Sequence, residues 1–424
     1  MDFISPILDL LVRLGLGIVK KTPWYKSVEW DWSNFHIHKR LYSYEKLNRK
    51  VSKFDFNNME KTWQLDGRNI ERIYGKDMKV MDFVDSDCIA RTVKIPYLEI
   101  INFNKNPDAQ IDICCSTADP LFIDKGYALP KDITNATKMI VEKVINFSKT
   151  THDGLHTRLA SLKCVGPHHY ECVLEQTSYF KQISSNLSVD CPINIEGQRT
   201  TVRGLERERH EEEVEVWKKT GIAFDALHPE CLTSLENSLL ANVIGVSAIW
   251  CMGDVENPKI YLMPRNKKVG VYRNNLGMPS GDIELPNKDT KRFSNPSLIE
   301  FLKWEIAREF AEETGLRDKN RPISGYSIKV DTKKAPYEVE MEIIPLAFVR
   351  EMYRGGKPQM FFLIRTEEIP IDVLKECFLA SLGKEEFDTF PLTTASLSAE
   401  VACNYLYALQ HLQRRNKNDE IYLN

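Results

Sequence analysis

The chain has 424 residues, of which 42% are hydrophobic and 10% aromatic, so it is long enough to form two or three domains with sizeable cores. A formal net charge of −3 gives no overall basic field of the kind that nucleic-acid-binding proteins use, and no nucleic-acid partner is expected. The ten cysteines include no Cys-x-x-Cys pair and there is no secretory cleavage pattern, so free thiols in a cytoplasmic protein are expected rather than disulfides or zinc.

Residues 3–21 form the first predicted element, a helix with leucine, isoleucine and valine at intervals of three and four. Asp9 and Arg13 interrupt this apolar stretch, which is too short and too charged to span a bilayer. The pattern predicts a helix that packs on its own protein or on a homodimer partner. The alternative is a peripheral membrane contact, with Lys20 and Lys21 at the end of an interfacial helix.

Residues 21–56 alternate aromatic and basic side chains, a composition that also occurs in nucleic-acid-binding proteins, but no recognised motif accompanies it. His36 and His38 would share one face of a strand. No cysteine or further histidine lies nearby, so a metal site is not expected there. We predict an N-terminal helical, aromatic-rich region over residues 1–90.

A second region, predicted as α+β, covers residues 91–235. Short apolar runs indicate strands, and a longer amphipathic stretch between them indicates a helix at 135–149. The strand runs are residues 93–103, 109–115 and 170–180. No metal site is expected at His168 and His169 either. Opposite charges at i and i+4 predict a solvated helix over 203–221.

The third region, residues 236–424, also alternates strands and helices. Two β-branched and aromatic runs at 243–252 and 258–266 are joined by a turn at Gly253, and two further strands are predicted at 337–351 and 359–366. A closing helix is predicted at 396–416. Strands, a charged helix, more strands and a last helix predict an α+β sandwich.

The charged helix, residues 300–316, carries the main candidate site. Residues at i, i+3 and i+4 share a helix face, so Glu309, Glu312 and Glu313 are predicted to converge. Crowded carboxylates repel one another unless a hard divalent cation lies between them, which indicates Mg²⁺ or Mn²⁺. Arg308 is predicted to orient a glutamate through a charged hydrogen bond, and Gly315 to end the helix. The alternative is a solvated charged face.

This spacing resembles the Nudix box, Gly-x5-Glu-x7-Arg-Glu-U-x-Glu-Glu-x-Gly-U, where U is a bulky apolar residue. The matching residues are Glu300, Arg308, Glu309, Phe310, Glu312, Glu313, Gly315 and Leu316. The first glycine departs from the pattern, because Ser294 stands in its place. A Pro-Ser-Gly turn ending at Gly281 comes earlier, and eighteen residues instead of five separate it from Glu300. We interpret the difference as an inserted surface loop, with Ser294 and Ser297 as candidate N-caps of the helix.

The resemblance implies a Nudix-type α/β/α sandwich over roughly residues 236–416, preceded by the N-terminal α+β region. Short matches, such as Leu240-Ala241-Asn242, are closest to the branch that includes UDP-sugar diphosphatases and domains associated with bacterial defence. Residues 177–190 resemble an element that precedes the box in that branch and helps to form the substrate pocket.

The resemblance also implies roles for individual residues. The metal ligands would be Glu309, Glu312, Glu313 and the backbone carbonyl of Gly281. Glu309, Glu313, Arg308 and Glu300 would take part in catalysis, with Glu300 supporting the site from its edge. The identity of the general base is left open, with a glutamate of the box and the downstream Glu342 and Glu351 as the candidates. Substrate phosphates need further cations near the strand ends. The candidate substrate-binding residues are the cations Arg265, Lys268 and Arg350, together with Gly281.

These residues predict a Mg²⁺-dependent pyrophosphohydrolase that cleaves a nucleoside diphosphate linked to another moiety, most simply a nucleotide sugar, by attack of water on phosphorus. The alternative is a catalytically weak Nudix-fold module that binds a nucleotide and acts as a sensor or regulatory domain. The intact glutamates favour the enzyme, and the displaced glycine and the long insertion favour the sensor.

Overall fold

The computed structural model describes residues 40–53, 79–84, 90–114, 126–148, 152–206, 233–253, 258–264, 276–285, 297–316, 327–331, 336–381 and 397–422. Several predictions from the sequence lie outside these residues. They are the helix at 3–21, the pair His36 and His38, most of the charged helix at 203–221, the candidate N-cap Ser294, and the candidate substrate contacts Arg265 and Lys268.

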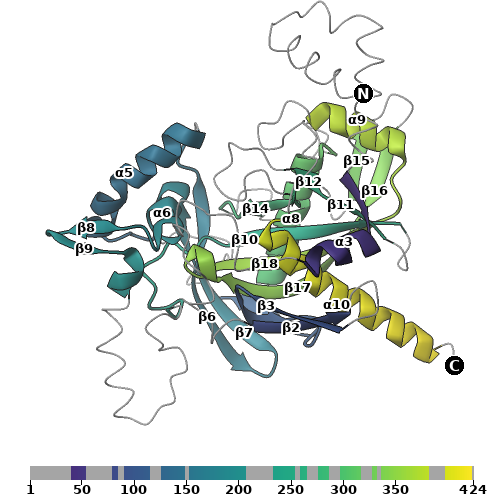
Figure 1. The fold of residues 1–424 in the computed structure, drawn as a ribbon, viewed down its shortest axis with the longest axis horizontal. Helices are drawn as coiled ribbons and strands as arrows, with labels where there is room; N and C mark the ends of the chain where they lie inside the picture. The colour runs from purple at the N-terminus through teal and green to yellow at the C-terminus, as the bar shows by residue number, and fades with distance from the viewer. Residues whose placement is uncertain are drawn as a thin grey trace, which may run out of the picture.

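A seven-stranded mixed sheet forms the centre of the molecule (Figure 1). Its order is β1-β11-β10-β18-β17-β4, and β14 pairs with β10 as well. β10 and β18 run parallel, whereas the other pairs are antiparallel. The bounds are β1 Leu41–Ser43, β4 Tyr97–Asn102, β10 Gly245–Met252, β11 Lys259–Tyr261, β14 Ser280–Asp282, β17 Glu342–Glu351 and β18 Lys357–Thr366.

Helices cover both faces of this sheet. α8 (Leu298–Thr314) and α9 (Ile371–Ser381) pack on one face, and α3 (Tyr44–Val51) and α10 (Ala399–Tyr422) pack on the other. Successive side chains of a strand point to opposite faces, so β10 serves both layers. Its Val246, Ala248 and Trp250 join the core with α8, and its Ile249 and Cys251 join the core with α10. The result is a three-layer α/β/α arrangement, and the predicted α+β class is confirmed.

A smaller three-stranded sheet of order β5-β7-β6 lies beside α8. Ile111, Leu159 and Leu174 extend the α8 core into it. α5, α6, β8 and β9 lie at one end of the molecule, on the left of Figure 1. The bounds are β5 Gln110–Ile113, β6 Leu155–Gly166, β7 His169–Ser178, α5 Lys131–Ser148, α6 Tyr179–Ser184, β8 Ile193–Ile195 and β9 Gln198–Thr200. Three further pairs are β2 Lys79–Val84 with β3 Ala90–Ile95, β12 Met263–Pro264 with β13 Leu276–Gly277, and β15 Ser327–Asp331 with β16 Pro336–Glu340.

Most predicted elements that fall on described residues appear close to their expected places. The strands predicted at 243–252, 337–351 and 359–366 correspond to β10, β16 with β17, and β18, and the helix predicted at 396–416 corresponds to α10. The strand predicted at 170–180 ends early, at Ser178. The side chain of Ser178 accepts a hydrogen bond from the Lys181 amide and so starts α6, because an N-cap residue satisfies a free helical N–H.

The central sheet takes strands from all three regions predicted from the sequence. β1 comes from residues 1–90 and β4 from residues 91–235, whereas the other strands lie within 236–424. The two early strands occupy the outer positions of the sheet, next to β11 and β17. Main-chain hydrogen bonds therefore connect the three regions within one sheet. The proposed boundaries near residues 90 and 235 stay a prediction.

None of the seven cysteines described by the structure forms a disulfide within the described ranges, in agreement with the expected thiols. These are Cys114, Cys164, Cys172, Cys191, Cys251, Cys377 and Cys403. Among the helices that the structure describes, none combines the length and the apolar character needed to cross a bilayer.

Candidate functional site

The helix α8 carries the glutamate cluster and is fixed at both ends as the sequence predicts. The Ser297 side chain accepts a hydrogen bond from the Glu300 amide at the N-terminus, and Gly315, at φ 75°, closes the C-terminus in the left-handed conformation. Between them, Phe310 is fully buried and packs edge-on against Trp250 of β10, with ring centroids 4.8 Å apart. The apolar face of α8 is therefore anchored on the sheet, and the register of its glutamates is fixed.

Arg308 lies at the centre of the carboxylates. Its guanidinium is 2.6 Å from Glu309 Oε1, 3.0 Å from Glu305 Oε2 and 3.1 Å from Glu312 Oε2. Burial alone lowers the pKa of Arg308, but the carboxylates of Glu305 and Glu309 more than offset this and raise it. Arg308 thus makes charged hydrogen bonds of the predicted kind, to three carboxylates instead of one, and its orienting role stays a prediction.

Glu305 was not singled out by the sequence, yet it is the most buried member of this cluster, with a side chain only 3% exposed. Burial raises its pKa from 4.5 to about 7, although Arg308 acts to lower it. The nearby Glu284 and Glu312 raise it further. This buried glutamate therefore takes up a proton near neutral pH, well above the pH at which an exposed glutamate does.

Folding stability should therefore depend on pH through Glu305. Between pH 4.5 and about 7 the folded protein keeps a proton on Glu305 that the unfolded chain has released, so stability from this group falls as pH rises. Glu305→Gln cannot lose this proton. The free energy of unfolding of the variant, relative to wild type, is expected to increase by about 3 kcal/mol between pH 4.5 and 8. Urea unfolding of both proteins at a series of pH values, in buffer containing EDTA, measures this difference in unfolding free energy.

A suitable control for this experiment is Glu45→Gln, which removes an exposed carboxyl group from α3. Its unfolding free energy should follow that of wild type across the same pH range. A Glu305→Gln profile that also runs parallel to wild type would contradict the raised pKa.

β14 places the Pro-Ser-Gly turn against α8. In the sequence the turn precedes the inserted loop and α8 follows it. The Ser280 amide donates a 2.9 Å hydrogen bond to Glu313 Oε2. Gly281 lies so close to Glu309 that a Cβ placed on it would be 2.3 Å from Glu309 Cδ, which no side chain could tolerate without a shift. The two parts of the predicted box, separated in sequence by eighteen residues, therefore meet in space.

The other predicted site residues lie further away. Glu300 is nine residues before Glu309, about 13 Å along the helix axis, and pairs with Lys303 at 2.8 Å. Arg350 is buried, and its guanidinium donates to the backbone carbonyls of Gly356 and Thr233. The roles of Glu300 and Arg350 at the site stay predictions.

The two downstream candidates for the general base lie at opposite ends of β17. Glu342 lies at the start of β17 and pairs with Arg365 at 3.0 Å, with a side chain that is 53% exposed. Glu351 lies at the end of the same strand with no exposed surface, 2.6 Å from Arg354. Burial raises the pKa of Glu351, although Arg354 acts to lower it.

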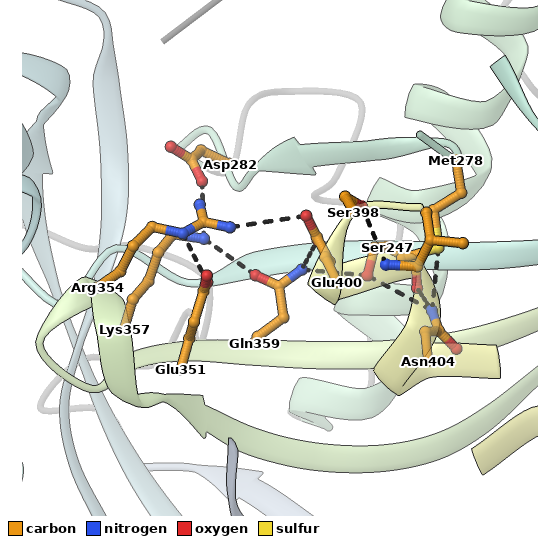
Figure 2. Close-up of polar contacts among 11 residues, drawn as sticks. Ser247, Met278, Asp282, Glu351, Arg354, Lys357, Gln359, Ser398, Glu400 and Asn404 are labelled. Atoms are coloured by element: carbon orange, nitrogen blue, oxygen red, sulfur yellow. Dashed lines mark hydrogen bonds and ion pairs between the residues drawn. The ribbon is translucent and has the colours of Figure 1, made fainter. Parts of the chain in front are cut away.

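Glu351 belongs to a buried polar network on the α10 face of the sheet, which Figure 2 shows. Lys357 Nζ is 2.9 Å from Asp282 Oδ1 and 3.0 Å from Gln359 Oε1. The Gln359 amide donates to Glu400 Oε1 and to the Ser247 hydroxyl, at 2.8 and 3.2 Å. Arg354 lies 3.6 Å from Glu400 Oε2, and Asn404 donates to the Ser247 carbonyl. These contacts join β10, β14, β17, β18 and α10.

Sequence reasoning missed this network. Lys357 and Gln359 stand at the start of a strand whose other residues are apolar, and nothing in their spacing indicates that both are 1% exposed. One signal was present in Gly245, which directly precedes the apolar run of β10. A Cβ on Gly245 would be 2.1 Å from Gln359 Oε1 and 2.2 Å from Lys357 Nζ. A glycine at the start of a buried strand can mark such a close approach.

The carboxylates of α8 have the donor chemistry that a hard divalent cation requires. Glu305, Glu309 and Glu312 already gather around one positive charge, the Arg308 guanidinium. Within the described ranges, no set of three or more His, Cys, Asp or Glu side chains is already spaced to hold a metal ion. Glu309 and Glu312 would therefore have to turn from Arg308 toward the metal.

Comparison with known proteins gives no assignment of the chain. No model of a protein family matches it, and no curated protein is significantly similar to it.

Proposed function

We propose that the protein is a Mg²⁺- or Mn²⁺-dependent pyrophosphohydrolase of the Nudix type. It would cleave a nucleoside diphosphate linked to another moiety, with a nucleotide sugar as the first choice, through attack of water on phosphorus. The proposal includes a cytoplasmic location, since the ten cysteines suit a reducing compartment.

The contact between β14 and α8 carries this proposal. A Nudix-type site needs the glycine turn and the glutamate helix together, and the inserted loop put that in question. Gly281 lies against Glu309, and the Ser280 amide binds Glu313. This contact supports a working box because a purely solvated charged face would have no reason to hold a turn in place against it.

The residues of α8 divide the roles between them. Glu309, Glu312 and Glu313, with the backbone carbonyl of Gly281, would hold the metal. When bound, Mg²⁺ or Mn²⁺ would neutralise the diphosphate oxygens and lower the pKa of the attacking water. Before a metal binds, the charged hydrogen bonds of Arg308 would hold Glu309 and Glu312 beside the site, and both carboxylates would exchange this partner for the metal.

Proton acceptance from the attacking water is assigned to a box glutamate. Glu351 is fully buried on the α10 face of the sheet, and Glu342 lies at the far end of β17 and pairs with Arg365. A general base must come within hydrogen-bond reach of the water it activates, and the glutamates next to β14 satisfy this requirement better.

One observation favours a second candidate, a module that binds a nucleotide without cleaving it. The guanidinium of Arg308 already offsets much of the negative charge of Glu305, Glu309 and Glu312, so the cluster is stable in the absence of a metal. A sensor would use the same surface as a recognition site.

A substrate panel separates the two candidates. Purified protein is incubated with 5′-nucleotide sugars, dinucleotides, nucleoside triphosphates and cyclic nucleotides, with Mg²⁺ or with EDTA, and phosphate-containing products are identified by mass spectrometry. We expect Mg²⁺-dependent release of a nucleoside monophosphate and a sugar phosphate from a nucleotide sugar. Binding of a panel compound with no turnover under any metal condition would reject the hydrolase and support the sensor.

A further inference from the structure

β14 is held from two opposite sides of the sheet. Gly281 pairs with Val246 and faces the α8 layer, where Glu309 lies against it. Asp282 pairs with Gly245 and faces the α10 layer, where Lys357 binds it. Adjacent residues of one short strand thus contact the glutamate helix and the buried network, as strand alternation requires.

The side chain of Lys357 is in an unusual place for an ammonium group. It is 1% exposed, whereas the side chain of its partner Asp282 is 22% exposed. Removing a charged amine from water costs several kcal/mol unless its hydrogen bonds are replaced. Lys357 replaces them with Asp282 and Gln359, in a space that exists only because residue 245 is glycine.

The other end of the network is attached to the middle of the central sheet and to α10. Gln359 is bound by Ser247 of β10 and by Glu400 of α10, and β18 lies in the middle of the sheet. β14, in contrast, has only three residues and pairs with β10 through three register positions. Main-chain bonds also hold the residues on either side, between Pro279 and Ala248 and between Ile283 and Thr157. The side-chain anchor at Asp282 adds to them from the opposite face of the sheet.

We infer that Lys357 is a positioning residue of the candidate metal site, which acts through Asp282 to hold β14 against α8 from the opposite face of the sheet. Without this anchor β14 moves away from α8, so that Glu313 loses the Ser280 amide and Glu309 loses its support at Gly281. The inference deepens the proposed function, and its metal-affinity measurement rests on that function.

Local hydrogen exchange tests the inference without a metal or a substrate. The variants are Lys357→Met, Asp282→Asn and the double variant, and the readout is amide exchange of peptides covering residues 276–285, which contain the Ser280 amide. We expect exchange there to become at least about tenfold faster in each single variant, with peptides of β17 unchanged. The double variant should exchange no faster than the singles, because both changes break one interaction.

A matched control is Arg203→Met, which breaks another ion pair, between Arg203 and the fully buried Asp190, in the part that contains β8 and β9. It should leave exchange at 276–285 as in wild type. Asp282→Asn preserves the shape of the side chain, so it keeps the test valid if Lys357→Met fails to fold. Unchanged exchange at 276–285, or equal acceleration in every peptide, would overturn the inference.

Mn²⁺ affinity, measured by electron paramagnetic resonance, connects the anchor to the site. Residues that orient metal ligands from behind typically contribute tenfold to a hundredfold to affinity, and a loss of about tenfold is expected for Asp282→Asn with none for Arg203→Met. Wild-type protein that binds no Mn²⁺ would count against the proposed function and leave the exchange result to decide the positioning role. Mn²⁺ affinity that stays at the wild-type value in Asp282→Asn would reject the link between anchor and metal.

Discussion

Glu309→Gln is expected to lower kcat/KM for the best substrate of the panel by about a thousandfold, near 4 kcal/mol of transition-state stabilisation. Glu309 is the box glutamate that lies against Gly281, and its side chain is only 15% exposed. The amide preserves its shape but removes the charge that would hold the metal. Initial rates at saturating Mg²⁺, over a range of substrate concentrations, give the number.

Glu312→Gln is expected to have a smaller effect, about tenfold, because its side chain is 30% exposed and is therefore more strongly screened by solvent than that of Glu309. Glu376→Gln on the neighbouring helix α9 makes the same chemical change outside the site and should retain wild-type rates. If Glu309→Gln lost no more activity than Glu312→Gln, the larger role expected for Glu309 would be contradicted.

Gly245→Ala is expected to destabilise the protein by about 3 kcal/mol or more, the largest stability effect anticipated for a single methyl group here. The added Cβ would meet Gln359 Oε1 at 2.1 Å and Lys357 Nζ at 2.2 Å, and either buried side chain can withdraw only by giving up hydrogen bonds that it makes in the network. Moving Lys357 also breaks its ion pair with Asp282, which leaves a buried charge without compensation. Chemical unfolding monitored by tryptophan fluorescence measures the loss.

Gly126→Ala provides the control for this experiment, because a Cβ on Gly126 has no atom within 4 Å. Its free energy of unfolding should remain within about 0.5 kcal/mol of that of wild type. A Gly245→Ala protein as stable as the Gly126→Ala protein would mean that Lys357 and Gln359 are not packed where the structure places them.

The strands and helices whose apolar or charged residues recur at a regular spacing could be predicted from the sequence. The apolar run of β10 and the i, i+3, i+4 spacing of α8 fixed the element types, and Ser297 and Gly315 fixed the ends of the helix. Arg308 could be assigned to the glutamates because its partners are one to four residues away. Local interactions on one helix leave a local pattern.

The network on the α10 face leaves no such pattern. Gln359 and Ser247 are 112 residues apart, and Gln359 and Glu400 are 41 apart, so their meeting depends on the whole sheet topology. A lysine at the start of a strand is usually solvated, and its burial follows from Gly245 and from α10 above it. Glu305 was missed for a related reason. Only the packing of α8 on the sheet distinguishes it from the other glutamates of a charged helix.

The two outer strands of the central sheet have a consequence for how this chain can be divided. β1 and β4 cover the open edges of β11 and β17, and both come from the first 102 residues. A chain shortened to begin at residue 236 would keep the box but expose two rows of unpaired main-chain groups. Such edges recruit other strands, so the shortened chain would tend to self-associate. The early part of the sequence thus protects the sheet that carries the glutamate helix, independently of any chemistry of its own.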